Sequence, residues 1–477
     1  MNIDTKNLWK KNASEIISLL DKKEITIEEV VDSSLDRIKE INPDINAIVT
    51  LINEEEKEKL INNFNNNTCS TLKGMPVLIK DINDVQNMRT TYGSKLYSDN
   101  IPKNSDIIVH TIEKNGGLII GKTNIPEFAA GSHTYNNVFG LTKNPWNTSL
   151  SAGGSSGGSA AALATGMSWF ASGSDLGGSL RNPASWCGVV GLRPTSGLIP
   201  HGPSNFPFFN LSVDGPMARN VEDLSIFLDA MVDHNKNDPL SFKGTKDSYY
   251  KNLLKREETK YLIGFTDDFG VFPCDKEVRG MMQNTLKLVQ NLGHDINNTY
   301  PDMSKSEYCF QTLRAYMFYC TYKGLLKKDK SFIKQDVIWN INKAKTITID
   351  DLLEAEKARA DIYNDTMKFF DKFDFLILPS SVVPPFNSQD KWVKKVEDTT
   401  FDNYVSWLMI AASISLTNCP SIALATSFSK DNAPFGIQIV APPYEEQKLI
   451  NFAKSLEENI NISDMVPINI NNENIRV

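Results

Sequence analysis

The sequence lacks the cysteine patterns that define small secreted or metal-binding proteins. Its six cysteines are spread over 477 residues without a CxxC pair. Disulfide scaffolds are short and rich in cysteine, and zinc sites need closely spaced ligands, so neither class fits this chain. Reduced thiols are typical of the cytoplasm, and we expect a cytoplasmic protein.

Basic charge and long apolar runs are also missing. The net charge is −8, whereas direct nucleic-acid binding usually requires an excess of basic residues, so we expect no nucleic-acid partner. No stretch reaches the roughly 18 apolar residues of a membrane span. Residues 1–6 lack the charged and apolar regions of a signal peptide. A hydrophobic fraction of 41% is nevertheless enough for a large core.

No linker rich in proline, glycine or serine divides the chain, which favours one large domain with appended helices. We expect a helical N-terminal segment at 1–60, an α/β domain at 61–465 and a poorly ordered tail at 466–477. Two helices are predicted in the first segment. Thr26 and Glu29 form a capping box before one of them, and Asn42-Pro43 is expected to end it.

Short apolar runs alternate with helical patterns along the rest of the chain. Strands are predicted at 75–79, 118–120, 169–171, 261–265, 375–378, 421–425 and 436–440. Helices are predicted at 105–115, 159–165, 220–233, 276–292 and 445–459. This alternation indicates an α/β fold with a central mixed, largely parallel sheet covered by helices, and residues 300–370 read as a helical excursion from it.

Ser155 lies in Gly153-Gly154-Ser155-Ser156-Gly157, which matches the G-x-S-x-G pattern of a hydrolase nucleophile. That pattern requires a strand directly before it, but residues 144–152 read as a loop. It also requires a histidine partner, and His201, His234 and His294 lie outside any motif. A flexible loop that precedes the alanine-rich helix is therefore the alternative interpretation of this serine.

A second pattern, G-x-x-x-x-G-K-T at 116–123, matches the consensus sequence of a phosphate-binding loop but not its structural context. Its middle residues are apolar and read as a strand, and Pro126 follows too soon for the helix that such a loop must begin. We therefore expect no nucleotide at this position and interpret Lys122 as a structural lysine.

Ser179 follows a pair of glycines in the segment 174–181. Glycines allow the backbone to approach a substrate closely. Successive N–H groups from Leu176, Gly177, Gly178 and Ser179 can converge on one point and stabilise an oxyanion. The alternative is a tight turn with an inert serine.

Lys80 ends an apolar run at the predicted carboxyl end of a strand, where α/β sheets bind ligands. Burial lowers the pKa of a lysine, and a neutral lysine can act as a base for a serine nucleophile. By itself such a residue is more often solvated. Because the chain also contains the loops of Ser155 and Ser179, the catalytic interpretation of Lys80 is favoured.

These residues together resemble the amidase signature family. The resemblance covers most of the chain and is weakest at about 235–400. It rests on the glycine- and serine-rich block at 153–194 and on flanking segments: G-M-P-V-L-I-K-D at 74–81, G-K-T-N-I-P-E-F at 121–128, G-P-M-A-R at 215–219 and P-F-G-I-Q at 434–438.

The resemblance implies that Ser179 is the nucleophile, that Ser155 follows a cis peptide bond and relays a proton, and that Lys80 is the base. The oxyanion hole is then formed by the N–H groups of residues 176–179. It also implies hydrolysis of a small-molecule amide through an acyl-enzyme, with no metal and no organic cofactor. The sequence carries no signal for the oligomeric state, and a homodimer is left open.

One branch of the family is the amidase subunit of a tRNA-dependent amidotransferase, which hydrolyses glutamine. That branch carries an acidic residue on the helix that precedes its L-A-G-x-P segment. Here the matching segment is 416–420, and the preceding residues 404–410 are apolar. This favours a free-standing amidase with an apolar or aromatic substrate group, for which the loop 205–209 can supply aromatic contacts. The alternative hypotheses are a catalytically silent binding protein and a glutamine-hydrolysing subunit.

Overall fold

The computed structural model describes residues 4–64, 70–245 and 247–470. Its α-helices are α1 (Ala13–Asp21), α2 (Ile27–Ile45), α3 (Glu54–Asn62), α4 (Ile107–Lys114), α5 (Gly157–Ala164), α6 (Arg181–Cys187), α7 (Val221–Met231), α8 (Tyr249–Leu253), α9 (Lys276–Asn291), α10 (Ser306–Tyr322), α11 (Gln335–Lys343), α12 (Ile349–Phe370), α13 (Met409–Ser415) and α14 (Glu446–Glu457). Its strands are β1 (Ile48–Leu51), β2 (Pro76–Lys80), β3 (Leu118–Thr123), β4 (Tyr135–Asn136), β5 (Gly140–Leu141), β6 (Phe170–Asp175), β7 (Val190–Arg193), β8 (Val213–Ala218), β9 (Leu262–Phe265), β10 (Asp295–Asn297), β11 (Phe375–Pro379), β12 (Lys395–Val396), β13 (Thr399–Thr400), β14 (Ser421–Phe428) and β15 (Pro434–Val440).

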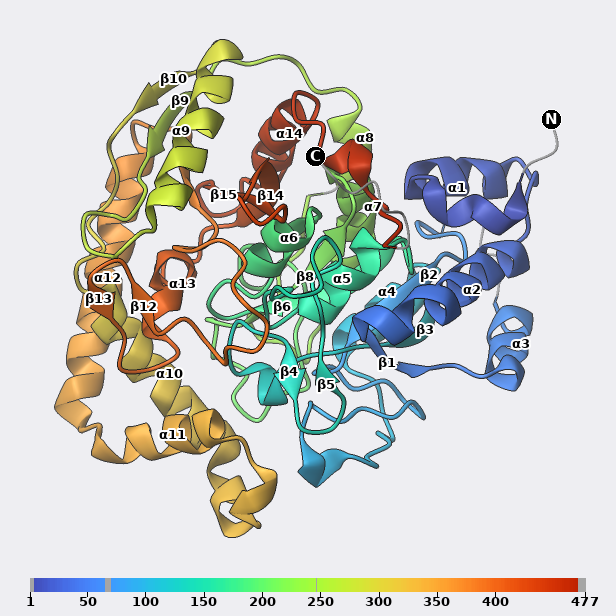
Figure 1. The fold of residues 1–477 in the computed structure, drawn as a ribbon, viewed down its shortest axis with the longest axis horizontal. Coiled ribbons are helices and arrows are strands. Elements are labelled where there is room, and N and C mark those ends of the chain that lie inside the picture. Colours follow the sequence, from blue (N-terminus) through green and yellow to red (C-terminus); the bar gives the residue numbers. More distant parts are fainter. Residues whose placement is uncertain (1–3, 65–69, 246, 471–477) are drawn as a thin grey trace.

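One sheet of 11 strands forms the centre of the molecule, in the order β1-β3-β2-β6-β8-β7-β14-β15-β11-β9-β10 (Figure 1). Parallel pairs join β3, β2 and β6 in one half of the sheet and β11, β9 and β10 at its far end. The other neighbours pair in the antiparallel sense. The expected α/β fold with a mixed sheet and covering helices is confirmed.

Alternation along the strands gives the sheet two buried faces. In β2, Val77 and Ile79 pack into the cluster that contains α1, α4, α7 and α14, whereas Leu78 packs into the cluster that contains α2, α5 and α6. Because side chains two residues apart share a face of a strand, Lys80 lies on the same face as Leu78. The strand therefore directs Lys80 toward α5.

The N-terminal segment differs from its prediction. The described part of 1–60 holds three α-helices and strand β1, which pairs with β3 at the sheet edge. The Thr26–Glu29 capping box is confirmed. The expected stop at Asn42-Pro43 is wrong, because α2 continues to Ile45 and ends at the left-handed residue Asn46. A proline in the last turn removes one hydrogen bond, and the Asn42 side chain stabilises the turn by bonding to Ala47 and Ile48.

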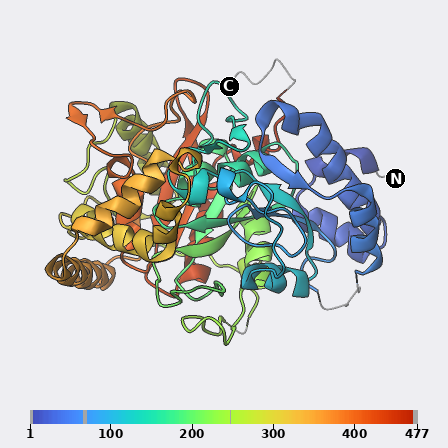
Figure 2. The same cartoon turned by 90° about the horizontal axis from the view of Figure 1, so that it is seen from below.

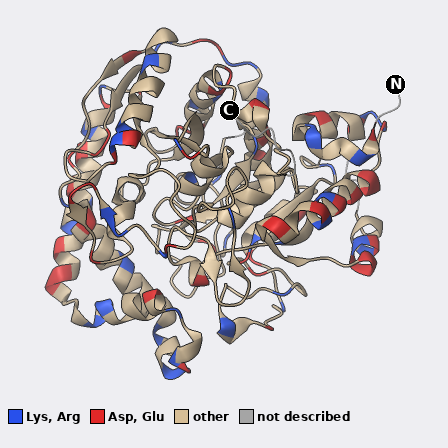
Figure 3. Cartoon of the chain, in the orientation of Figure 1, with Lys and Arg blue, Asp and Glu red and all other residues tan. Residues whose placement is uncertain are grey.

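The helical excursion at 300–370 is confirmed as α10, α11 and α12. It lies at the opposite end of the molecule from the N-terminal helices in both views (Figures 1 and 2). Basic and acidic residues both occur along these outer helices, whereas the ribbons at the centre of the molecule are mostly uncharged (Figure 3). Within the described ranges, no helix has both the length and the hydropathy of a membrane span.

The last residues of the chain contradict the expected poorly ordered tail as far as they are described. Val466 and Ile468 are buried in the cluster formed by α2 and α5, and the Ile468 carbonyl accepts a hydrogen bond from Arg37. The apolar residues of this Asn- and Ile-rich stretch pack against the core and thereby order it. The remainder of the expected tail, 471–477, lies outside the described residues.

Candidate active site

Lys80 is fully buried at the carboxyl end of β2, where the sequence predicted it. Its Nζ lies 2.8 Å from Ser155 Oγ, 2.8 Å from Ser156 Oγ and 2.9 Å from Ser174 Oγ. Within the described residues, no carboxylate lies at ion-pair distance from this amine. These three hydroxyl groups form a hydroxyl shell around the amine. Because hydroxyl groups can donate or accept hydrogen bonds, the shell accommodates a charged or a neutral lysine.

Burial lowers the pKa of Lys80 from 10.5 to about 7, and the longer-range attraction of Asp214 and Asp175 limits the fall. A charged amine loses its hydration when it is buried, and hydroxyl groups replace that hydration only in part. The amine is therefore close to half-deprotonated at neutral pH. This is the range in which a side chain serves best as a general base.

Ser155 is held in a tightly packed loop directly before α5. The Gly154–Ser155 peptide bond is cis, in agreement with what the resemblance implied. A Cβ atom on Gly154 would lie 2.7 Å from the backbone nitrogen of His133, so the close contact between the two chain segments requires glycine. The Gly154 carbonyl accepts a hydrogen bond from Ser132 Oγ. The structure confirms that residues 144–152 form a loop outside the named strands.

Ser179 lies in the turn between β6 and α6, so the strand–turn–helix context of a nucleophile motif occurs here and not at Ser155. Gly178 has φ +109°, a conformation that favours glycine, and a Cβ atom there would lie 2.7 Å from Ala411 Cβ. Ser155 and Ser179 line the same cavity of about 210 Å³. The fold thus brings the two serines to one site with Lys80.

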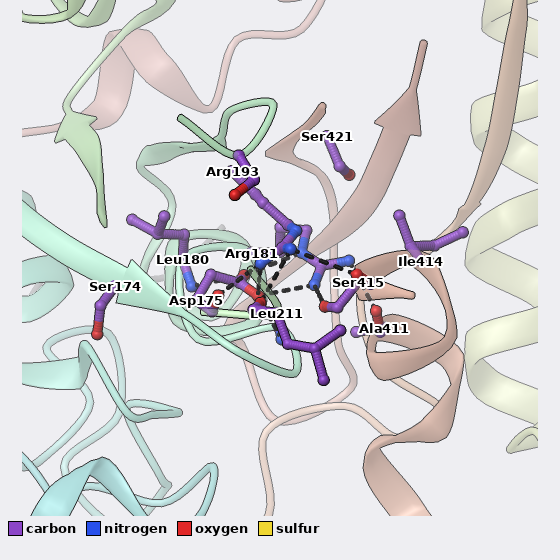
Figure 4. Close-up of polar contacts among 12 residues, drawn as sticks. Ser174, Asp175, Leu180, Arg181, Arg193, Leu211, Ala411, Ile414, Ser415 and Ser421 are labelled. Atoms are coloured by element: carbon purple, nitrogen blue, oxygen red, sulfur yellow. Dashed lines mark hydrogen bonds and ion pairs between the residues drawn. The ribbon is translucent and has the colours of Figure 1, made fainter. Parts of the chain in front are cut away.

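Asp175 organises the turn that carries Ser179. Its carboxylate accepts hydrogen bonds from the N–H groups of Gly178 at 2.9 Å and Leu180 at 3.0 Å. Figure 4 shows the buried Arg181 and Arg193 converging on this carboxylate, with Arg181 bonded to both of its oxygens. Burial opposes ionisation, but the two guanidinium groups outweigh it and lower the pKa of Asp175.

This network corrects one part of the predicted oxyanion hole. The Gly178 N–H is donated to Asp175 and is therefore directed into the protein interior. Among the described residues, no acceptor engages the N–H groups of Leu176, Gly177 or Ser179. Four successive N–H groups follow from the order of the residues alone, but the buried carboxylate of Asp175 binds one of them.

Replacement of Asp175 by alanine is expected to lower the free energy of unfolding by about 3–5 kcal/mol, because Arg181 and Arg193 would keep buried charges without their main partner. Urea unfolding at pH 7 measures this change. Asp365→Ala removes an exposed partner of Lys368 and is expected to cost less than about 1 kcal/mol. Equal effects of the two substitutions would contradict this role of Asp175.

His201 lines the same cavity and donates toward Asp214, with Nδ1 2.7 Å from Oδ2. Partial desolvation in the cavity wall disfavours the charged ring, but Asp214 and neighbouring carboxylates outweigh it and raise the pKa of His201 to about 9. A histidine that is protonated at neutral pH is a poor base. Among the described residues, Lys80 and not a histidine is bonded to Ser155, which disfavours the G-x-S-x-G interpretation.

The rest of the cavity wall is largely apolar and aromatic. It includes Phe206, Pro207 and Phe209 from the predicted loop, which confirms that this loop reaches the site. Phe206 and Phe209 stack on each other with ring centroids 5.4 Å apart, and Phe209 packs edge-on against Tyr316 of α10. The further apolar residues are Ile82, Phe128, Ala129, Leu176, Ile199, Val213, Leu240, Met317, Phe318 and Tyr322.

The Amidase family model matches residues 29–450 of the chain. The chain belongs to the amidase signature family. It is 32% identical to a glutamyl-tRNA(Gln) amidotransferase subunit of Thermoanaerobacter pseudethanolicus, over 94% of this chain and 96% of that protein. It is 29% identical to an acylamidase of Rhodococcus erythropolis, again over 94% of this chain and 96% of the relative.

The fold agrees with this family. A bacterial aryl acylamidase superposes with a TM-score of 0.87 at 24% identity and covers 96% of this chain and 99% of its own. The 6-aminohexanoate cyclic dimer hydrolase superposes equally well, at 0.87 and 25% identity, over 97% of this chain and 99% of its own. This amidase signature protein is an amide-bond hydrolase.

Sequence reasoning missed several residues of the site. Ser156 and Ser174 complete the hydroxyl shell of Lys80, and Asp175 with its two arginines shapes the turn of Ser179. Arg181 and Arg193 both lie in the segment 153–194, which consists mostly of apolar and small residues and contains Ser179. Charged residues within such a block indicate a buried ion pair, and this signal could have identified Asp175 as their partner.

Lys122, which ends the false phosphate-binding pattern, lies on β3, as predicted for a structural lysine. It is fully buried, and its Nζ lies 2.8 Å from Thr90 Oγ1 and 3.6 Å from Asp81 Oδ1. The apolar middle of the pattern forms the strand itself. Backbone N–H groups that pair in a sheet cannot hold a phosphate, so this pattern has no role in nucleotide binding.

Proposed function

We propose that this amidase hydrolyses a linear carboxamide through an acyl-enzyme on Ser179, with Ser155 as proton relay and Lys80 as base. The observation that carries the proposal is the 2.8 Å contact between Lys80 Nζ and Ser155 Oγ, made beside a cavity that Ser179 also lines. Burial without a carboxylate partner supplies the neutral amine that a base requires.

In the first half-reaction, Ser155 transfers its proton to neutral Lys80 and accepts the proton of Ser179. Ser179 Oγ then bonds to the amide carbon, and the N–H groups of Leu176, Gly177 and Ser179 stabilise the oxyanion. The carbon–nitrogen bond breaks as the relay returns a proton to the leaving amine. In the second half-reaction, water attacks the ester carbon by the same relay and releases the carboxylate and free Ser179.

The lining residues support a substrate with an apolar or aromatic group beside the amide. Aromatic side chains such as Phe206, Phe209 and Phe318 bury such a group and exclude water from the reacting atoms. The segment 406–415, which forms a short 3₁₀-helix and α13, carries no carboxylate. This segment therefore offers no carboxylate to the ammonium group of a glutamine substrate, which does not favour the amidotransferase alternative.

A hydrolysis screen tests the proposed function. Aliphatic amides, anilides and peptide amides are supplied to the full chain, and the released amine or ammonia is measured. Amides with an apolar or aromatic acyl group are expected to be turned over, and glutamine is expected to be a poor substrate. Preferred hydrolysis of glutamine would instead support the amidotransferase alternative.

The pH dependence follows from the pKa of Lys80. Because the neutral amine is the active form and its pKa is lowered to about 7, kcat/KM is expected to rise about tenfold per pH unit below pH 7 and to level off above it. Rates measured from pH 5 to 9 with a neutral anilide test this. A rate that falls as the pH rises through 7 would contradict the assignment of Lys80 as the base.

A further inference from the structure

The side chain of His201 lies in the wall of the catalytic cavity, where this cavity adjoins a second one of about 660 Å³. His201 and Ser174 line both cavities, and Ser174 belongs to the hydroxyl shell of Lys80. In the antiparallel pairing of β6 with β8, Ser174 lies opposite Asp214, which is the partner of His201. The sheet thus places the imidazole ring beside the proposed reaction centre.

Two hydrogen bonds fix the position of His201. Its Nδ1 lies 2.7 Å from Asp214 Oδ2, and its backbone N–H donates to Asp238 Oδ2 at 2.9 Å. Asp214 is buried, with only 1% of its side chain exposed. The Nδ1 edge of the ring is therefore directed into the protein interior.

The opposite edge of the ring is accessible. The His201 side chain is 43% exposed, although its Nδ1 is bonded to a buried carboxylate. Among the described residues, no hydrogen bond or ion pair engages its Nε2. Because the two ring nitrogens point in different directions, the bond to Asp214 leaves Nε2 on the exposed side, in the cavity wall.

This accessible nitrogen carries a proton. Partial desolvation disfavours the charged ring, but Asp214, with smaller contributions from Asp106 and Asp238, outweighs it and raises the pKa of His201 to about 9. At pH 7 both ring nitrogens therefore carry a proton. The Nδ1–H is donated to Asp214, and the Nε2–H remains as a donor toward the cavity.

The surroundings of His201 favour a neutral acceptor. Among the described residues that line the catalytic cavity, His201 is the one basic side chain, and Asp238 is the one acidic side chain. Both Asp238 oxygens are bonded to backbone N–H groups, of His201 and Leu240. A carboxylate ligand would meet Asp238 and Asp214 beside the ring, whereas a carbonyl oxygen accepts the Nε2–H without that repulsion.

We propose that His201 is a specificity residue whose Nε2–H donates a hydrogen bond to a second carbonyl of the substrate, separate from the amide that is hydrolysed. The apolar wall accommodates the chain that joins the two carbonyl groups. A site with a directed donor disfavours an analogue that lacks the acceptor. The inference rests on the proposed function and names its substrate class: amides with an apolar chain and a second, neutral carbonyl.

Hexanamide, 4-oxohexanamide and 5-oxohexanamide test the proposal, because each oxo amide replaces one methylene of hexanamide with a carbonyl. They are titrated at pH 7 into the full chain carrying Ser179→Ala, which binds an amide without turnover. We expect at least one oxo amide to bind at least about tenfold more tightly than hexanamide. Adding His201→Asn should reduce the difference to within about twofold, because asparagine can still donate to Asp214 but lacks the outward donor.

His234→Asn is the matched control, because this exposed histidine lines neither cavity, and it should leave the difference unchanged. Nitrogen NMR of the chain labelled with nitrogen-15 histidine observes the ring directly, and the His201 signals are those absent from His201→Asn or His201→Phe. At pH 7 both nitrogens should show the shifts of a doubly protonated ring. The tighter oxo amide should move the Nε2 signal, and hexanamide should not.

A neutral His201 ring at pH 7, no saturable binding, or oxo amides that bind no more tightly than hexanamide would overturn the proposal. A difference that persists in a folded His201→Asn chain would also overturn it, and circular dichroism monitors folding. Tighter binding of adipic acid monoamide than of both oxo amides would show that the site selects a carboxylate instead. Labelling of Ser179 by a fluorophosphonate needs no second carbonyl, so failure of the proposed catalytic function appears separately in that reaction.

Discussion

Replacement of Ser179 by alanine is expected to lower kcat by at least about 10⁴-fold and to abolish covalent labelling by a fluorophosphonate. The reason is that Ser179 Oγ forms the bond to the acyl group, and alanine offers no atom that can replace it. The measurements are release of amine from an anilide and the mass of the labelled protein. The fold is expected to persist, because Ser179 is only half-buried.

Ser196→Ala provides the matched control, because Ser196 is another serine in the wall of the same cavity. Its turnover is expected to stay within about threefold of the parent chain. Ser155→Ala separates the two possible nucleophiles. Labelling that persists in Ser179→Ala but is lost in Ser155→Ala would show that Ser155 is the nucleophile.

Replacement of Lys80 by methionine is expected to lower kcat/KM by roughly 10³-fold or more, because general-base catalysis contributes about 10²–10⁴-fold. Methionine has nearly the same length and places no charge in the buried site. The activity that remains should lose the rise with pH near 7. Steady-state rates from pH 5 to 9 measure both effects, and thermal unfolding shows that the variant is folded.

Lys80→Arg distinguishes a base from a fixed cation. Arginine keeps the charge and the hydrogen-bond donors but does not deprotonate in proteins, so it should be as inactive as the methionine variant. Activity near that of the parent chain in Lys80→Arg would show that the site needs a cation and not a base. Comparable losses in both variants support the neutral amine.

The sequence predicted those elements in which local patterns and burial agree. The alternating strands and helices, the Thr26–Glu29 capping box and the strand that ends at Lys80 all follow from residue spacing. Prediction failed where tertiary contacts outweigh local preference. Pro43 stays within α2 because the Asn42 side chain satisfies the following turn, and β1 forms because β3 offers an open edge.

The candidate site divides in the same way. Lys80, Ser155 and Ser179 stand out by their neighbours in the chain, and the resemblance of those segments assigned them roles. Ser156 and Ser174 have no sequence signal of that kind, because their proximity to Lys80 depends on where β6 and the loop before α5 meet. The oxyanion donors were counted from adjacent residues, whereas their availability depends on Asp175.

The sequence by itself therefore determined the family, the fold class and the three residues of the proposed triad, since each rests on order along the chain. Only the tertiary structure decided the lowered pKa of Lys80 and the loss of the Gly178 donor. Burial and the approach of charges depend on which surfaces pack together. Those contacts join residues far apart in the sequence, such as Lys80 and Ser155, and no local pattern records them.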